Sequence, residues 1–157
     1  MINTVTNRKK LAKTSKTPGK TQSINVFNVD NLFYLVDLPG YGFAKVAFAV
    51  KSKWDKLLDN YFKKFSNHIK LGFTLIDIRR NISKEDLAMI NMYNNADSCL
   101  NYIVLTKSDK FKNNEKKVKL DKFKKEYPFL NDLFILFSAK SKEGRLEVLK
   151  IIKKILK

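Results

Sequence analysis

Short apolar runs alternate along this chain with longer amphipathic segments. Five runs rich in β-branched and aromatic residues have the pattern of strands: residues 21–29, 32–37, 71–78, 102–105 and 133–137. Apolar residues at the spacing of a helix face predict helices around residues 54–65, 84–94, 120–127 and 146–156. Strands and helices alternating in this order predict an α/β fold, a mostly parallel sheet with helices on both faces.

A few single residues sharpen this prediction. Ser83 and Asp86 resemble the capping box that begins a helix, with Asp in place of the usual Glu. Trp54 is expected to anchor the core. The only histidine, His68, is expected in a surface loop, so a histidine-based metal site or triad is excluded. One cysteine, Cys99, excludes an internal disulfide and is expected to be a buried or inert thiol.

The length of 157 residues fits one domain, and 44% apolar residues suffice for a sizeable core. There are 32 Lys and Arg against 15 Asp and Glu, a formal charge of +17. This charge favours a polyanionic partner such as RNA, the ribosome or a membrane surface, although an AT-rich genome would produce the same bias. Basic residues concentrate in residues 9–20 and 110–125. No window resembles a membrane span or secretory signal, so we expect a cytoplasmic or organelle-matrix protein.

The predicted strand 32–37 ends in the run Asp37-Leu38-Pro39-Gly40-Tyr41-Gly42. Ligands of parallel sheets bind at the carboxyl ends of the strands. A carboxylate such as Asp37 at a strand end can hold a water bound to Mg²⁺. Gly40 has no Cβ, so its N–H can approach a γ-phosphate closely. An ordinary turn through Pro-Gly explains the same residues.

The predicted strand 102–105 is followed by Thr106-Lys107-Ser108-Asp109. Guanine presents two adjacent donors, N1–H and the exocyclic amine, and the Asp109 carboxylate can accept both. Adenine presents an acceptor and a donor in the same direction, so Asp109 would discriminate against it. The stem of Lys107 can lie along the base plane. A charged loop after a strand remains the plain alternative.

Two further loops could complete such a site. Ser138-Ala139-Lys140 follows the last predicted strand, where the Ala139 N–H could reach the guanine O6 atom. Upstream, Thr21 lies in a basic Pro-Gly loop and could place its hydroxyl on Mg²⁺ when a γ-phosphate is bound. Each loop alone also fits a simple turn.

Taken together, these motifs resemble the EngB (YihA/YsxC) family of bacterial ribosome-biogenesis GTPases over the whole chain. The resemblance rests on Pro18-Gly19-Lys20-Thr21-Gln22, Asp37-Leu38-Pro39-Gly40-Tyr41-Gly42, Asp77-Ile78-Arg79, Thr106-Lys107-Ser108-Asp109 and Ser138-Ala139-Lys140. Thr106, where most G domains carry Asn, also fits this family.

The resemblance implies a single three-layer P-loop GTPase (G domain) fold over residues 1–157, with GTP/GDP and Mg²⁺ as cofactors. It implies slow GTP hydrolysis and a role in assembling the large ribosomal subunit, linked to cell division and septation. Thr21 and Asp37 would be the metal ligands, and Gly40 would sense the γ-phosphate. Tyr41 stands where many GTPases carry a water-orienting Gln, so no catalytic side chain is expected there. The guanine loops would contribute Thr106, Lys107, Asp109, Ser138 and Ala139.

One motif of P-loop GTPases, Gly-x-x-x-x-Gly-Lys-Ser/Thr, does not occur in this sequence. Residues 2–6 resemble the helix that follows this loop in the family, so the first strand and the P-loop are expected to be missing. The simplest explanation is a misassigned start or a fragment, with the motif encoded just upstream of Met1. A polypeptide of residues 1–157 is expected to be poorly stable or rearranged, and to bind GTP weakly or not at all.

Two other functions compete with a GTPase. The first is a basic α/β module that binds no nucleotide and docks on ribosomal RNA by charge. The second is a phospho-acceptor receiver domain built around Asp37 or Asp77, which the lack of clustered acidic residues near the amino end disfavours.

Overall fold

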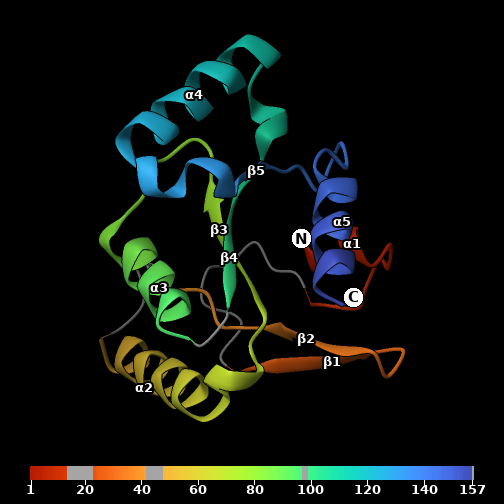
Figure 1. Cartoon of the computed structure of the whole chain (residues 1–157), viewed down its shortest axis with the longest axis vertical. Helices are drawn as coiled ribbons and strands as arrows, with labels where there is room; N and C mark the ends of the chain where they lie inside the picture. Colours follow the sequence, from red (N-terminus) through yellow and green to blue (C-terminus); the bar gives the residue numbers. More distant parts are fainter. Residues whose placement is uncertain (14–22, 42–47, 97–98, 157) are drawn as a thin grey trace.

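The computed structural model describes residues 1–13, 23–41, 48–96 and 99–156 (Figure 1). Its strands are β1 (Asn25–Val29), β2 (Phe33–Asp37), β3 (Leu71–Asp77), β4 (Leu100–Thr106) and β5 (Phe134–Leu136). Its α-helices are α1 (Ile2–Val5), α2 (Phe48–Phe65), α3 (Lys84–Asn94), α4 (Asn113–Glu126) and α5 (Arg145–Ile155). Three short 3-10 helices are η1 (Ser66–His68), η2 (Ser108–Lys110) and η3 (Pro128–Leu133).

The described strands form two separate sheets. Strands β3, β4 and β5 make a parallel sheet in the order β3-β4-β5, with Asp77 opposite Thr106 at the carboxyl edge. Strands β1 and β2 form an antiparallel hairpin that does not pair with the parallel sheet. In Figure 1 the hairpin lies beside α2 at one end of the molecule, and α4 lies at the other end. The single, mostly parallel sheet expected from the sequence is therefore divided between β2 and β3.

Both faces of the parallel sheet are covered, which gives the three-layer arrangement. One face carries Ile76, Ile103 and Leu105 and packs against residues of α3, α4 and η3. The opposite face carries Val104 and Ile135, which pack with Val5 of α1 and Val148 of α5. All these strand residues have at most 1% of their surface exposed. Successive residues of a strand point to opposite faces, so continuous apolar runs are what a doubly covered sheet requires.

A local sequence signal explains where one helix begins. Ser83 begins α3 with the predicted capping box, because its hydroxyl accepts the Asp86 N–H and its own N–H donates to the Asp86 carboxylate.

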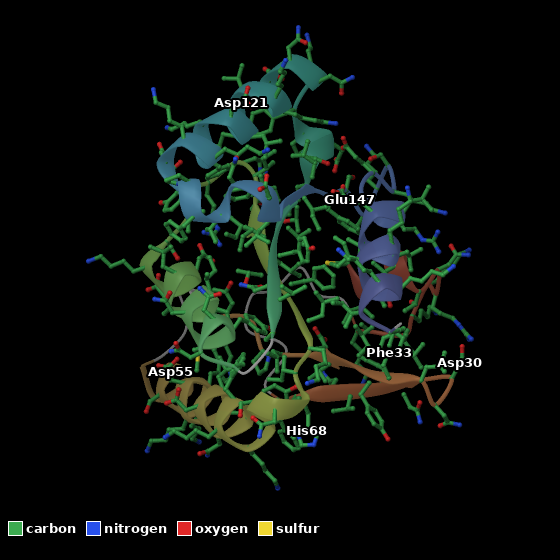
Figure 2. The ribbon with its side chains drawn as sticks, viewed as in Figure 1. Asp30, Phe33, Asp55, His68, Asp121 and Glu147 are labelled. Atoms are coloured by element: carbon green, nitrogen blue, oxygen red, sulfur yellow. The ribbon has the colours of Figure 1, made fainter. Side chains whose placement is uncertain are left out.

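Trp54, at 5% exposure, is buried as expected. His68 ends η1 and is exposed (Figure 2). The thiol of Cys99 is half-buried, and burial raises its pKa to about 11, which fits the expected inert thiol.

Candidate functional site

The ends of β4 and β5 bring two predicted residues into contact. Asp109, in η2 just beyond β4, accepts a 2.6 Å hydrogen bond from the hydroxyl of Ser138, which follows β5. The Ser138 hydroxyl lowers the pKa of Asp109 below its ordinary value, so the carboxylate is held ionised. About 17% of the Asp109 side chain is exposed. The structure thus presents an oriented, charged acceptor at the carboxyl edge of the sheet.

The loop after β5 is built around the buried Ser138. Its hydroxyl oxygen accepts the backbone N–H groups of Lys140 and Ser141, both at 3.1 Å, while its proton goes to Asp109. Ala139, between Ser138 and Lys140, is exposed, and its N–H donates to none of the other described residues. An exposed backbone donor therefore lies in the same loop cluster as the Asp109 acceptor.

Lys107 lies on the same edge in a strained conformation. Its backbone is left-handed, with φ 60° and ψ 32°, which a non-glycine residue adopts at a cost of about 1 kcal/mol. Its ammonium group is 2.9 Å from the carboxylate of Asp77 at the end of β3. Asp77 also receives the Arg79 side chain at 2.9 and 2.7 Å. Arg79 and then Lys107 hold the pKa of Asp77 far below its usual range.

Thr106 joins the ends of two strands. Its hydroxyl donates at 3.1 Å to the backbone carbonyl of Ile76 on β3, and its own carbonyl accepts the N–H of Ile78 at 3.0 Å. These bonds keep the ends of β3 and β4 level, so that Asp77 and Lys107 can meet. Thr106 thus supports the loop structurally.

One residue of this cluster, Glu143, is not predicted from the sequence. Its carboxylate accepts the buried Ser108 hydroxyl at 2.6 Å and the Lys116 ammonium at 2.8 and 3.0 Å. Its backbone carbonyl accepts the Ser138 N–H at 3.1 Å. Burial alone would raise the pKa of Glu143, but Lys116 and Ser108 bring it below its ordinary value. Glu143 therefore connects the two loops with α4, across separations of 27 and 35 residues that no local pattern reveals.

Two of the predicted phosphate and metal residues, Asp37 and Gly40, belong to the segment of the other sheet. Asp37 ends β2, where burial raises the pKa of its carboxyl against the opposing effects of the Met1 ammonium and Asn25. Gly40 is half-buried three residues later, after the buried Pro39. Thr21 lies outside the described residues. Within the described ranges, no group of three or more His, Cys, Asp or Glu side chains could hold a metal ion.

The Tyr41 side chain is packed inside the protein, with its hydroxyl buried. It packs against Leu58, Phe62 and Tyr93, and its buried hydroxyl has no hydrogen-bond partner of standard geometry among the described residues. Burial, and then the nearby Asp86 carboxylate, raise the pKa of this hydroxyl far above its usual range. Tyr41 therefore links the segment after β2 to the helix α3.

Asp86, beside this hydroxyl, is the buried member of an ion pair with the exposed Arg80. Its side chain is 1% exposed and receives two bonds from the Arg80 guanidinium, one of them at 2.9 Å. Burial alone would raise the pKa of Asp86, but Arg80 and the Ser83 capping bonds hold it below its ordinary value. This pair fixes the start of α3 behind the carboxyl edge of β3.

The predicted residues therefore fall into two groups. Lys107, Asp109, Ser138 and Ala139 lie in adjoining loops at one edge of the parallel sheet. Asp37 ends the separate hairpin, and Gly40 follows it. No described helix is long and apolar enough to cross a membrane.

Comparison of the sequence with known proteins assigns this chain to a family. Residues 1–107 match the model of a family described as 50S ribosome-binding GTPase. The chain is 42% identical over 154 residues to a probable GTP-binding protein EngB of Thermoanaerobacter pseudethanolicus, covering 98% of this chain and 79% of that protein. It is 43% identical to the protein of the same name from Fusobacterium nucleatum, over 99% of this chain and 79% of that one.

Solved structures agree on the fold. A crystal structure of a probable GTP-binding protein EngB matches with a TM-score of 0.75 and 18% identity, over 99% of this chain and 89% of that one. A structure of Era in complex with MgGDPNP and a segment of 16S ribosomal RNA matches with a TM-score of 0.73 and 18% identity, over 98% of this chain and 51% of that one. At these identities the likeness establishes the G-domain fold.

Proposed function

Because this chain belongs to the EngB family of probable GTP-binding proteins, we propose that it binds guanine nucleotides through the loops that follow β4 and β5. The observation that carries this proposal is the placement of the Asp109 carboxylate, oriented by Ser138 at 2.6 Å, in one loop cluster with the Ala139 N–H. Guanine requires such a set, an acceptor for its two adjacent donors and a donor for O6.

The residues present fit the base. Asp109 is held ionised, and its second oxygen lies 3.9 Å from the Lys110 ammonium. Ala139 is exposed, and its N–H donates to no other described residue. Lys107 would lie along the base, with its ammonium fixed by Asp77. Adenine offers the wrong donor pattern to Asp109, so the site should exclude it.

The phosphates and Mg²⁺ would be bound by Asp37 at the end of β2, by Gly40 beyond it and by Thr21, which precedes β1 in the sequence. Asp37 would hold Mg²⁺ through a water, Thr21 would bind the metal directly, and Gly40 would donate its N–H to the γ-phosphate. Mg²⁺ suits a single carboxylate, because it keeps several waters and takes other oxygens from the phosphates. When bound, it would neutralise the charge that develops on the transferred phosphoryl group. Tyr41 offers no water-orienting group, so hydrolysis should be slow.

The biological role that we propose is assembly of the large ribosomal subunit, with ribosomal RNA or the 50S particle as partner. The family described as 50S ribosome-binding GTPase supports it, as does the formal charge of +17. Through this role the protein would act in the cytoplasm or an organelle matrix and influence cell division and septation.

Equilibrium binding of radiolabelled GTP and ATP to the chain, with and without Mg²⁺, tests the nucleotide proposal. Measurable GTP binding, strengthened by Mg²⁺ and not displaced by ATP, is the expected result. The affinity should be low, because this sequence contains no Gly-x-x-x-x-Gly-Lys-Ser/Thr loop, and phosphate contacts are among the strong ones in such sites. Binding of ATP as strongly as GTP would contradict the proposal.

A second candidate is a basic module that binds ribosomal RNA without nucleotide. The observation that favours it is the excess of 17 positive charges. Salt-sensitive RNA binding without any nucleotide binding, even at millimolar GTP, would select this candidate.

A further inference from the structure

Three charged side chains meet where β3 and β4 end. Asp77 is the last residue of β3 and lies opposite Thr106, so it is a close neighbour of Lys107, the next residue of the chain after β4. Arg79 follows in a turn, which the Arg80 N–H closes by donating to the Asp77 carbonyl at 3.1 Å. Because β3 and β4 run side by side (Figure 1), their register brings Asp77 and Lys107 together.

Arg79 fixes the Asp77 carboxylate through three hydrogen bonds. The Oδ1 atom of Asp77 accepts the Arg79 backbone N–H at 3.1 Å and the Arg79 Nε–H at 2.9 Å. The Oδ2 atom accepts the Arg79 Nη2 group at 2.7 Å. A guanidinium that contacts both oxygens sets the plane of a carboxylate, whereas an ammonium group acts as a point charge and does not. The carboxylate of Asp77 is thereby held in one orientation.

The oriented carboxylate in turn holds the end of the Lys107 side chain. The Lys107 ammonium lies 2.9 Å from Oδ2 of Asp77, the oxygen that also accepts the Arg79 Nη2 group. The side chains of Lys107 and Arg79 are 55% and 51% exposed. Ion pairs with this exposure contribute little to stability. What the three charges can supply is order, because the four-carbon stem of a lysine is otherwise flexible.

We propose that Asp77 and Arg79 are positioning residues of the guanine site: Arg79 orients the Asp77 carboxylate, and this carboxylate holds the Lys107 stem in place before the base binds. The inference rests on the proposed function, since it requires that the Lys107 stem lies along a bound guanine. Ordering one long side chain upon binding weakens affinity about 2- to 12-fold, so a stem that is ordered in advance avoids this loss. Arg79 acts through Asp77 and does not contact the base.

Titration of ¹⁵N-labelled variants with GDP, followed at the Ala139 amide, tests the proposal. Arg79→Gln should raise the Kd for GDP about 2- to 12-fold. Arg79→Lys keeps the charge but cannot contact both carboxylate oxygens in the same way, so it should bind GDP almost as weakly as Arg79→Gln. Arg8→Gln is the matched control, because Arg8 is exposed and its replacement removes the same charge.

A double-mutant cycle with Lys107→Met separates positioning from general support of the fold. If Arg79 acts through Lys107, Arg79→Gln should change the GDP affinity of the Lys107→Met variant by less than about twofold. Asp77→Asn should behave like Arg79→Gln in both backgrounds. An equal loss in both backgrounds would mean that Arg79 supports the loops, or attracts phosphate, independently of Lys107. Circular dichroism melts of each variant verify folding.

The outcomes separate this inference from the proposed function. A wild-type chain whose Ala139 resonance does not move with GDP, or moves equally with ADP, would remove the guanine site and its positioning residues together. A wild-type chain that responds to GDP alone would leave the site intact. In that case, wild-type affinity of Arg79→Gln or of Arg79→Lys, or additive losses in the cycle, would overturn the positioning role alone.

Discussion

Replacing Glu143 with Ala should loosen both loops of the proposed guanine site. The substitution leaves the Ser108 hydroxyl, at 0% exposure, without its acceptor, and removes the carboxylate that binds the Lys116 ammonium at 12% exposure. A buried hydroxyl without a partner costs about 1–3 kcal/mol, and the lost charged bond adds about 1 more because Lys116 can turn toward water. The expected loss of unfolding free energy is about 2–4 kcal/mol.

For a chain of this length, that loss corresponds to a decrease in the thermal midpoint of roughly 5–15 °C. Circular dichroism melts measure it, and hydrogen exchange should show faster opening of the Ser108 and Ser138 amides. Glu143→Gln keeps an acceptor and should cost about half as much. Glu147→Ala on α5 is the control (Figure 2), because Glu147 is exposed and contributes at most about 1 kcal/mol at the start of the helix. If Glu143→Ala melts within about 2 °C of the wild type, this role of Glu143 is wrong.

Three further predictions concern the fold and the site. Gly72→Ala should lower the unfolding free energy measured in urea titrations by about 1–3 kcal/mol, because the added Cβ would lie 2.5 Å from the Tyr93 ring. An unchanged urea midpoint would contradict this close packing of Gly72 against Tyr93. The fold lowers the pKa of Asp77 and Asp86, so the stability that these carboxylates contribute is present above about pH 4 and is lost as the pH falls through their pKa values in the folded protein. Asp86→Asn should therefore reduce the dependence of the unfolding free energy on acid pH. Lys107→Met should shift the thermal midpoint by less than about 4 °C, because its ion pair is largely exposed, yet weaken GDP binding.

Much of the fold could be predicted from the sequence, because its elements have strong local patterns. The observed α3, with its Ser83–Asp86 capping box, ends at Asn94 as predicted, and the predicted strand 71–78 corresponds to β3. The expected absence of the first strand predicts a gap in the sheet, but it does not show which of the remaining strands pair on either side of that gap. Strand pairing depends on contacts between distant segments, and the pattern of β2 alone does not reveal its neighbour.

The site shows the same limit. The carboxyl ends of parallel strands share an edge of the sheet, so the loops after β4 and β5 are expected to be neighbours. In the structure Asp109 and Ser138, one from each loop, share a 2.6 Å hydrogen bond. Glu143 could not be predicted, because its loop carries no motif and its partners lie 27 and 35 residues away. The buried position of the Tyr41 hydroxyl beside Asp86 likewise depends on how α3 packs.

The most direct test of the guanine site is a nuclear magnetic resonance titration of the ¹⁵N-labelled chain with GDP, ADP and xanthosine diphosphate. Weak binding suffices for this measurement, because shifts of individual amides report contacts at millimolar ligand. We predict that GDP moves the Ala139 amide resonance while ADP does not, and that Asp109→Asn weakens GDP and makes xanthosine diphosphate the better ligand. If ADP moves Ala139 as much as GDP, or if Asp109→Asn leaves the order of the three ligands unchanged, these loops do not read guanine.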